Sequence, residues 1–483
     1  MNLVKKITYK YSKIPVQARA SFWFLVCGIL QNGLNIITLP VFTRLLTTNQ
    51  YGLSSTYFAW NDLFVVICTL RLSYGVFDKG MIRYSDKRDK FESSLLGLTT
   101  VISLTMLILF LFFHSIVEKM IGMSFTLCLS LFICQIFAPS LLFWTARNKY
   151  EYKYQKFTIV TLATVIICTF FNLIAVIFCN QDRGVVKILS YQAIWSFVNI
   201  FFYIYIFYKG KIFYDKDIWR YALKFNLPLI PYFLSTLILD KADRIMIGNF
   251  CGNGDVALYS VSYNLGRLMV LLTSSLDATL TPWIYQKIKN KEFKNSKKIS
   301  VCILVAMMVC GSLFMLFAPE LVTIFANEKY RKAVYVIPPV IASYFFVMLY
   351  HLVSKIEFYY ERTKTIAKIT ALAAVLDIIL NYFFIPKFGY IAAGYTTLFC
   401  YIIMAILHTG ISFMLAEEKK IEKEIFPWKK FCLLSVIMLG ITILVNILYQ
   451  WLYIRYFLIF VIVIISLLAR KKIIDMYYLL KER

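Results

Sequence analysis

Fourteen apolar segments of about 20 residues follow one another along the chain, and they constrain its fold more than any other feature. A helix of about 20 apolar residues is long enough to cross the hydrocarbon core of a bilayer. The chain of 483 residues is 60% hydrophobic and 16% charged, whereas a soluble protein carries roughly 25% charged residues. We therefore predict an all-α polytopic membrane protein with about 14 transmembrane helices. The segments lie at approximately 21–43, 53–77, 93–113, 122–145, 157–179, 188–208, 226–250, 256–282, 299–317, 333–354, 366–385, 389–414, 431–449 and 456–469.

Basic residues alternate between the loops on the two sides of these segments. Of the 52 Lys and Arg residues, 39 fall on the side of the N-terminal tail and 9 on the other side, and the remaining four lie within segments. Lys and Arg collect in loops that stay cytoplasmic. The pattern predicts an even number of spans and both termini in the cytoplasm; the family resemblance described below implies that the membrane is the bacterial plasma membrane. It also explains the net charge of +26 without a nucleic-acid partner.

The order of segments suggests two halves. The sequence around the first two segments is weakly echoed around the seventh and eighth, and transporters are often built from such repeats. We expect an N-terminal lobe at 1–208, a cytoplasmic linker at 209–225, a C-terminal lobe at 226–415, and two further spans with a basic tail at 416–483. The loops are too short for a separate catalytic domain, the 11 Cys form no CxxC pair, and the three His lie far apart. We therefore expect no enzyme, no metal site and no cofactor.

Charges inside the apolar segments are the candidate functional residues. Asp240, Lys241, Asp243 and Arg244 share one segment, and Arg267 lies near the middle of the next. Asp240, Asp243 and Arg244 fall on one helical face, where an acid–base pair can form, and Lys241 is turned about 100° away. Such residues cost about 2.5–3.5 kcal/mol each at a helix centre and mark substrate pathways more often than scaffolds. We favour a solvated cavity wall that meets an anion over a structural ion pair.

Three further charges have open interpretations. Arg44 is either an interfacial residue whose charge reaches toward water or a cavity cation. Asp62 and Asp377 lie mid-segment, and each is either a counter-ion for Arg267 or a protonatable coupling site. The sequence does not choose between these roles.

Two stretches carry a family resemblance. "LPVFTRLLTTNQYG" at 39–52, and "NLPLIPYFLSTLILDKADRIMIGNF" with "VALYSVSY" at 226–263, resemble the Wzx-type O-antigen and capsule flippases. These belong to the multidrug/oligosaccharidyl-lipid/polysaccharide exporter superfamily. The resemblance implies two six-helix lobes around a central cavity and alternating access. It also implies transfer of an undecaprenyl-pyrophosphate-linked oligosaccharide to the outer leaflet for surface polysaccharide biosynthesis.

The same resemblance implies roles for particular residues and partners. Arg44, Arg244 and Arg267, with Lys241 adjacent, match the cavity cations that meet pyrophosphate and sugar. The last two spans are compatible with a groove for the lipid tail. The implied partners are the lipid-linked oligosaccharide, membrane lipids and other polysaccharide assembly proteins.

Two other functions remain as alternatives. A cation-coupled multidrug exporter of the same superfamily would use an acidic cavity, whereas the bases here outnumber what that mechanism needs. A polysaccharide polymerase or membrane glycosyltransferase would carry a large outer loop with catalytic residues. No predicted outer loop exceeds about 15 residues, so the enzyme is the least favoured.

Overall fold

The computed structural model describes residues 15–179, 182–291, 293, 295–419 and 426–468, and this part of the chain contains helices and no strands. Most of the two predicted basic tails, at 1–14 and 469–483, lies outside the described residues. The chain forms two compact units, Met1–Leu234 and Ser235–Arg483. Each unit is described by itself.

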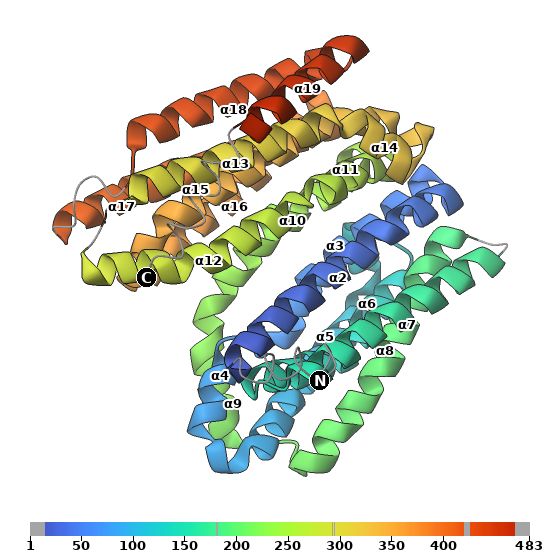
Figure 1. The fold of residues 1–483 in the computed structure, drawn as a ribbon. Helices are drawn as coiled ribbons and strands as arrows, with labels where there is room; N and C mark the ends of the chain where they lie inside the picture. The colour runs from blue at the N-terminus through green and yellow to red at the C-terminus, as the bar shows by residue number, and fades with distance from the viewer. Residues whose placement is uncertain (1–14, 180–181, 292, 294, 420–425, 469–483) are drawn as a thin grey trace, which may run out of the picture. The chain divides into compact units, whose positions relative to one another are not determined.

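In the first unit, long helices pack side by side (Figure 1). Helix α6 packs against α5 and α8, α7 packs against α2 and α8, and α3 packs against α5, α6 and α8. Helix α3 begins with a capping box, because the Thr47 hydroxyl accepts from the Gln50 main chain and the Gln50 side chain accepts from the Thr47 main chain. The helices are α2 Val16–Leu45, α3 Thr48–Thr69, α4 Val76–Arg83, α5 Arg88–Ile121, α6 Phe125–Tyr150, α7 Tyr154–Phe178, α8 Arg183–Gly210 and α9 Lys216–Asn226, with a 3-10 turn at Ser85–Lys87.

In the second unit, α15 is the central helix. It packs against α12, α13, α17 and α18, while α16 packs against α17, and α19 packs against α13. Helix α10 begins in the first unit and continues into this one. The helices are α10 Ile230–Cys251, α11 Asn253–Gly266, α12 Met269–Asn290, α13 Ser296–Leu316, α14 Ala318–Ala326, α15 Ile337–Tyr359, α16 Thr363–Phe388, α17 Tyr390–Glu418, α18 Trp428–Leu448 and α19 Leu452–Leu468, with a 3-10 helix at Glu328–Val336. A further 3-10 helix, Leu227–Leu229, comes just before α10 and belongs to the first unit.

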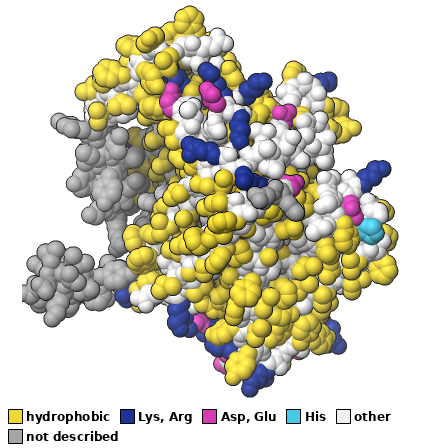
Figure 2. Space-filling view, turned by 90° about the vertical axis from the view of Figure 1, so that its right-hand side faces the viewer, with side chains coloured by type: hydrophobic (Ala, Val, Ile, Leu, Met, Phe, Trp, Pro, Cys, Tyr) yellow, Lys and Arg dark blue, Asp and Glu magenta, His cyan; other side chains and the backbone are white. Residues whose placement is uncertain are grey.

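The prediction of an all-α polytopic membrane protein is confirmed. Twelve helical stretches of the described chain are long and apolar enough to cross a membrane. The other two predicted spans, at 53–77 and 456–469, correspond to α3 and to the 17-residue α19. Large apolar side chains are exposed on many of these helices, and Figure 2 shows them over much of one face. Such a surface is suited to lipid rather than to water.

Some details of the predicted segments are wrong. The segment 53–77 is not one helix, because α3 ends at Thr69, and Leu70 and Arg71 adopt left-handed conformations. The segment 256–282 is broken at Arg267 and Leu268, between α11 and α12. Amphipathic α9 lies in the predicted linker, and its buried face packs beside α5. Because charged and polar residues interrupt its apolar residues, α9 contains no continuous apolar run that would reveal it in the sequence.

Candidate functional site

In the second unit, the charged side chains of α10 that were predicted to lie within the membrane form hydrogen bonds with polar side chains of α11, α16 and α17. Helix α10 carries Asp240, Lys241, Asp243 and Arg244 within five residues. Asp243 is 0% exposed and Arg244 is 5% exposed. A buried charge is tolerated when its hydrogen-bonding groups are satisfied. The contacts of these side chains therefore define the site.

The first part of the site is a fully buried acidic network. Asp243 accepts hydrogen bonds from Asn381 Nδ2 at 2.7 Å, Thr397 Oγ1 at 2.9 Å and the Tyr259 hydroxyl. The same Asn381 nitrogen lies 3.3 Å from Asp377 Oδ2. One amide thus bridges two carboxylates that are both 0% exposed. Two buried carboxylates in one site favour binding of a positive charge between them.

The second part of the site is cationic and surrounds Asp240. The Asp240 carboxylate accepts from the Tyr263 hydroxyl at 2.7 Å and pairs with Lys241 Nζ at 3.3 Å. Arg244 and Arg267 also act on it electrostatically. Lys241 thus pairs with this carboxylate, and two arginines lie near enough for their charges to act on it. Arg267 is exposed, and it lies at the break between α11 and α12, where its side chain is accessible.

The structure shows which contacts Arg244 makes within α10. The sequence allowed it to pair with Asp240 or Asp243 on one helical face, and in the structure Arg244 Nη1 donates to the main-chain oxygen of Asp240 at 2.8 Å. The Arg244 guanidinium lies over the Tyr263 ring at 4.5 Å. Lys241 takes the Asp240 carboxylate instead, because its long stem reaches back to the adjacent residue. In this conformation Arg244 is buried and does not form a solvated wall.

The structure places the other predicted residues in different surroundings. Asp377 lies with Asp243 in the acidic network, and Asp240 is the acid close to Arg267. Arg44 is exposed in the last turn of α2, and Asp62 is half-buried in α3. Both belong to the first unit. Their roles in binding or coupling stay predictions.

Sequence reasoning missed one intramembrane cation. The predicted segment begins at residue 188, one residue after Lys187, but Lys187 lies inside α8. Its Nζ is 2.9 Å from Ser54 Oγ and lies over the rings of Phe42 and Tyr51 at 4.7 and 4.6 Å. The sequence signal was Asp182, a typical N-cap residue, which starts the helix before Arg183 and so includes Lys187. A cation held by rings and a hydroxyl is poorly neutralised.

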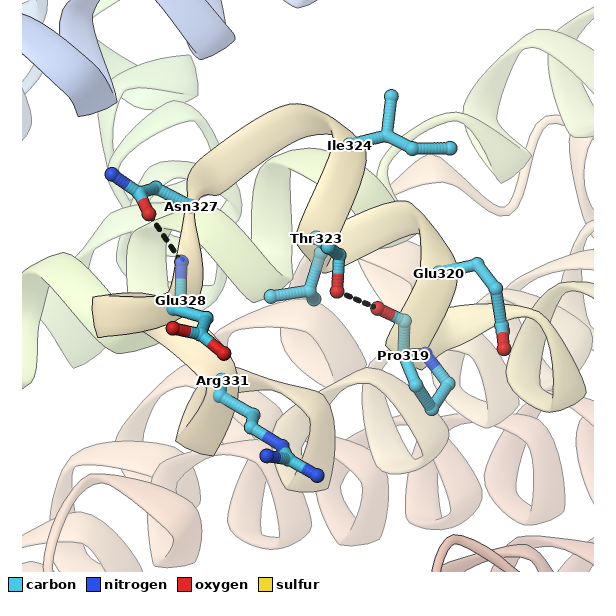
Figure 3. Close-up of a pocket in the computed structure, with 8 residues that line it drawn as sticks. Pro319, Glu320, Thr323, Ile324, Asn327, Glu328 and Arg331 are labelled. Atoms are coloured by element: carbon cyan, nitrogen blue, oxygen red, sulfur yellow. Dashed lines mark hydrogen bonds between the residues drawn. The ribbon is translucent and has the colours of Figure 1, made fainter. Parts of the chain in front are cut away.

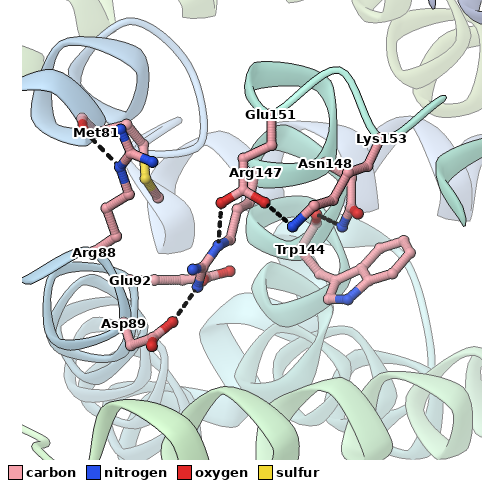
Figure 4. A network of polar contacts seen from close by, with 9 residues as sticks. All are labelled: Met81, Arg88, Asp89, Glu92, Trp144, Arg147, Asn148, Glu151 and Lys153. Atoms are coloured by element: carbon pink, nitrogen blue, oxygen red, sulfur yellow. Dashed lines mark hydrogen bonds and ion pairs between the residues drawn. The ribbon is translucent and has the colours of Figure 1, made fainter. Parts of the chain in front are cut away.

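A separate ionic network joins α5 and α6 in the first unit (Figure 4). Arg147 contacts Asp89 at 2.5 Å, Glu92 at 2.7 Å and Glu151 at 3.0 Å, and Lys153 also pairs with Glu151. Burial raises the pKa of Glu151, but hydrogen bonds from Lys153 and Arg147 outweigh it and bring that pKa below its usual range. Glu92 is buried. The network therefore depends on a single arginine.

Two surface hollows lie apart from the intramembrane charges. One has a volume of about 680 Å³ and adjoins the Arg147 network; it is lined by Arg88, Lys149, Tyr150, Glu151, Tyr152 and Lys153. The other, of about 350 Å³, lies over α14 (Figure 3) and includes Glu320. Glu320 accepts from Arg455 Nη2 at 2.5 Å and from the Tyr456 hydroxyl at 2.8 Å, which ties α19 to the second unit. Within the described residues, no group of three or more His, Cys, Asp or Glu could hold a metal ion.

Two family models match the chain. The model described as "Polysaccharide biosynthesis protein" matches residues 18–287, and the MatE model matches residues 228–383. An uncharacterized membrane protein of Methanocaldococcus jannaschii is 26% identical over 297 residues, which are 58% of this chain and 56% of that relative. The match therefore spans little more than half the length of that relative.

Solved structures share the fold. The lipid II flippase MurJ in an inward closed conformation is similar with a TM-score of 0.59 at 20% identity, over 91% of this chain and 100% of that one. A multidrug resistance transporter of the MATE family in an inward-facing conformation gives 0.56 at 15% identity, over 80% and 99%. A superfamily transporter from Pyrococcus furiosus, described as having a binding pocket of reverse polarity, gives a TM-score of 0.54 at 14% identity, over 83% of this chain and 95% of that one. At these identities the likeness shows the fold, which is that of the multidrug/oligosaccharidyl-lipid/polysaccharide exporter superfamily.

Proposed function

The chain belongs to the polysaccharide biosynthesis protein family, and from this premise we propose that it is a flippase for a lipid-linked oligosaccharide. It is a multi-pass plasma-membrane transporter of the exporter superfamily. The proposed substrate is an oligosaccharide repeat unit on undecaprenyl pyrophosphate, as for the Wzx-type O-antigen and capsule flippases. The proposed action is transfer from the inner to the outer leaflet by alternating access.

The observation that carries this proposal is the group of cations around Asp240. Lys241, Arg244 and Arg267 act on one carboxylate within the membrane-spanning part of the second unit. Each such charge costs about 2.5–3.5 kcal/mol at a helix centre, so three of them beside one acid need a compensating function. An anion supplies it, and the planar guanidinium of the exposed Arg267 suits phosphate oxygens in a bidentate contact.

The physics of the substrate matches this arrangement. A pyrophosphate and its sugars cannot cross hydrocarbon unaided, because each unsatisfied polar group costs several kcal/mol there. Fixed cations in a hydrated path lower that barrier while the prenyl tail stays in lipid. The transfer makes and breaks no bond, so it needs no nucleophile or metal.

We assign the energy coupling to the buried acids. Asp243 and Asp377 share the Asn381 amide and are closed off from solvent, so a proton bound between them changes the charge beside Arg244. Arg244 follows Asp243 directly in α10, and its Nη1 donates to the main-chain oxygen of Asp240 one turn earlier. Proton binding at the buried acids can therefore alter the field at the Asp240 group, about one helical turn away on α10.

A cation-coupled multidrug exporter is the second candidate. It is favoured by the MatE match at residues 228–383 and by the same two buried acids, which would serve a cationic drug. The two candidates differ in what a null strain accumulates. Loss of a flippase enlarges the pool of lipid-linked repeat units in the inner leaflet, whereas loss of a drug exporter leaves that pool unchanged and raises drug sensitivity.

Complementation of the null strain tests the proposal. We expect Arg267→Ala to abolish surface polysaccharide while the protein remains folded in the membrane, and Arg267→Lys to restore part of it. Lys keeps the charge but loses the planar fork. Full activity of Arg267→Ala would remove this residue from the substrate site.

A further inference from the structure

The larger surface hollow, which belongs to the first unit, lies where three membrane-crossing helices end. Helix α5 begins at Arg88, α6 ends at Tyr150, and α7 begins at Tyr154. All of the lining residues belong to these helix ends or to the short turn between α6 and α7. Both connections carry bases on the side predicted to be cytoplasmic. The hollow therefore lies at the membrane surface, and its volume of about 680 Å³ is that of a small-ligand site.

The lining of this hollow carries more positive than negative charge. Its cations are Arg88, Lys149 and Lys153, and its acid is Glu151. The Glu151 carboxylate is already engaged, because one oxygen accepts from Arg147 Nε at 3.0 Å and the other pairs with Lys153 Nζ (Figure 4). The negative charge of the lining is thus balanced from within the protein. Arg88 and Lys149 are the two cations of the lining that this carboxylate does not engage.

Arg88 presents a planar fork that is fixed by its own contacts. Its Nε donates to the Met81 main-chain oxygen at 3.1 Å, and its guanidinium lies over the Tyr150 ring at 5.4 Å. Among the residues that the structure describes, its two Nη groups have no hydrogen-bond partner. A guanidinium with both Nη groups open to a hollow suits two oxygens of one phosphate.

Lys149 adds a second positive charge from the end of α6. It is exposed, its Nζ lies over the Phe157 ring at 5.0 Å, and its charge acts on Asp78 of α4. Within the described chain it forms no ion pair. Tyr150 and Tyr152 also line the hollow, and tyrosine is enriched at the level of lipid headgroups. The hollow thus combines two cations with interfacial aromatic rings.

We propose that this hollow binds the phosphate of an anionic membrane lipid, such as phosphatidylglycerol, from the cytoplasmic leaflet. That leaflet carries a negative surface potential, and basic pockets between helix ends on its side suit anionic headgroups. Arg88 takes two phosphate oxygens, and Lys149 supplies the second positive charge. The site lies within the first unit and does not depend on the proposed function, because a drug exporter would meet the same lipids.

Apolar surface next to the hollow favours a lipid over a soluble phosphate. Helix α7, which starts at the hollow, exposes Ile159 by 69%, about 8 Å along the helix from Tyr154. Ile166 and Phe170, seven and eleven residues further on, are also exposed and fall on the same face of the helix. The acyl chains of a lipid whose headgroup fills the hollow therefore have apolar surface within their reach.

Native mass spectrometry of the purified full chain tests the proposal with three probes. Dioleoyl phosphatidylglycerol and dioleoyl phosphatidylcholine share their chains and differ in the net charge of the headgroup, whereas glycerol 1-phosphate has the phosphate without chains. We expect phosphatidylglycerol to bind at least about fivefold more tightly than phosphatidylcholine, and millimolar glycerol 1-phosphate not to displace it. Equal binding of the two lipids would overturn the proposal. Displacement by glycerol 1-phosphate would overturn it in favour of a soluble phosphate.

Charge variants locate the bound lipid. Lys149→Gln should weaken phosphatidylglycerol about fivefold, the factor that corresponds to about 1 kcal/mol for one base near a membrane surface, and should leave phosphatidylcholine unchanged. Lys156→Gln is the matched control, because Lys156 is exposed in the first turn of α7 and does not line the hollow. Adding Arg88→Gln to Lys149→Gln should remove the preference for phosphatidylglycerol.

The exposed position of Lys149 keeps the test independent of folding, and an unchanged unfolding midpoint of Lys149→Gln in detergent checks this. The control should change the affinity for phosphatidylglycerol by less than about twofold, because screening by salt limits the effect of a charge that does not contact the lipid. Equal losses in Lys149→Gln and Lys156→Gln would show that the lipid responds only to net charge, and would overturn the site.

Discussion

Replacement of Arg244 is expected to weaken the fold, which sets it apart from Arg267. The Arg244 guanidinium is buried, donates to the Asp240 main chain at 2.8 Å and lies 4.5 Å from the Tyr263 ring. Its charge also acts on buried Asp243. Removing one partner of a buried charged group costs about 3–5 kcal/mol. Asp243 keeps hydrogen bonds from Asn381 and Thr397, so we expect Arg244→Leu to cost about 3 kcal/mol, at the lower end of that range.

The same substitution at Arg267 serves as the comparison. Arg267 is exposed, and substitutions at exposed positions change stability by about 0.5 kcal/mol or less. Thermal unfolding in detergent, followed by tryptophan fluorescence, should show a lower midpoint for Arg244→Leu and an unchanged one for Arg267→Leu. Adding Asp243→Asn to Arg244→Leu should recover part of the loss, because it removes the charge left behind. Equal midpoints for the two single variants would refute the structural role given to Arg244.

Two further predictions concern Arg147 and Gly97 of the first unit, and Gly410 is the control for Gly97. Arg147→Met should cost about 3 kcal/mol, because it leaves buried Glu92 without its cation. Because the pKa of Glu151 is lowered in the folded protein, the ionised Glu151 contributes to stability at neutral pH, and this contribution is lost as the pH falls below about 4. A loss of stability in Arg147→Met that grows on acidification would contradict this. Gly97→Ala should destabilise by about 1–3 kcal/mol, because a Cβ there would lie 1.9 Å from the Phe213 main-chain oxygen. Gly410→Ala in α17, where a Cβ meets nothing within 4 Å, should instead stabilise by up to about 1 kcal/mol; equal unfolding midpoints for the two variants would show the close approach at Gly97 to be wrong.

The membrane helices could be predicted because each is specified by local composition. An apolar run of about 20 residues forms a helix in lipid whatever its neighbours are, since its main chain must satisfy its own hydrogen bonds. The same reasoning failed at Arg267, where the apolar character continues through a break in the helix, and at α9, whose apolar side chains alternate with charges. Both depend on packing rather than on average hydropathy.

The candidate site could be predicted in its residues but not in its contacts. Asp240, Asp243, Arg244 and Asp377 stand out because charge in an apolar segment is costly. Which polar groups these charges meet depends on helices that are more than 130 residues apart, as in the hydrogen bond from Asn381 to Asp243. Helical spacing only placed Asp240, Asp243 and Arg244 on one face, whereas in the structure Tyr263 contacts both the Arg244 guanidinium and the Asp240 carboxylate.

Translocation by the purified protein in vesicles tests the central claim most directly. Vesicles would carry a fluorescent undecaprenyl-pyrophosphate oligosaccharide in both leaflets, and a membrane-impermeant pyrophosphatase or quencher would report the fraction that reaches the outside. We predict that wild-type protein makes the inner-leaflet fraction accessible, that Arg267→Ala does not, and that a cationic dye such as ethidium is not moved. Transport of ethidium without movement of the lipid-linked sugar would contradict the account and establish the multidrug exporter.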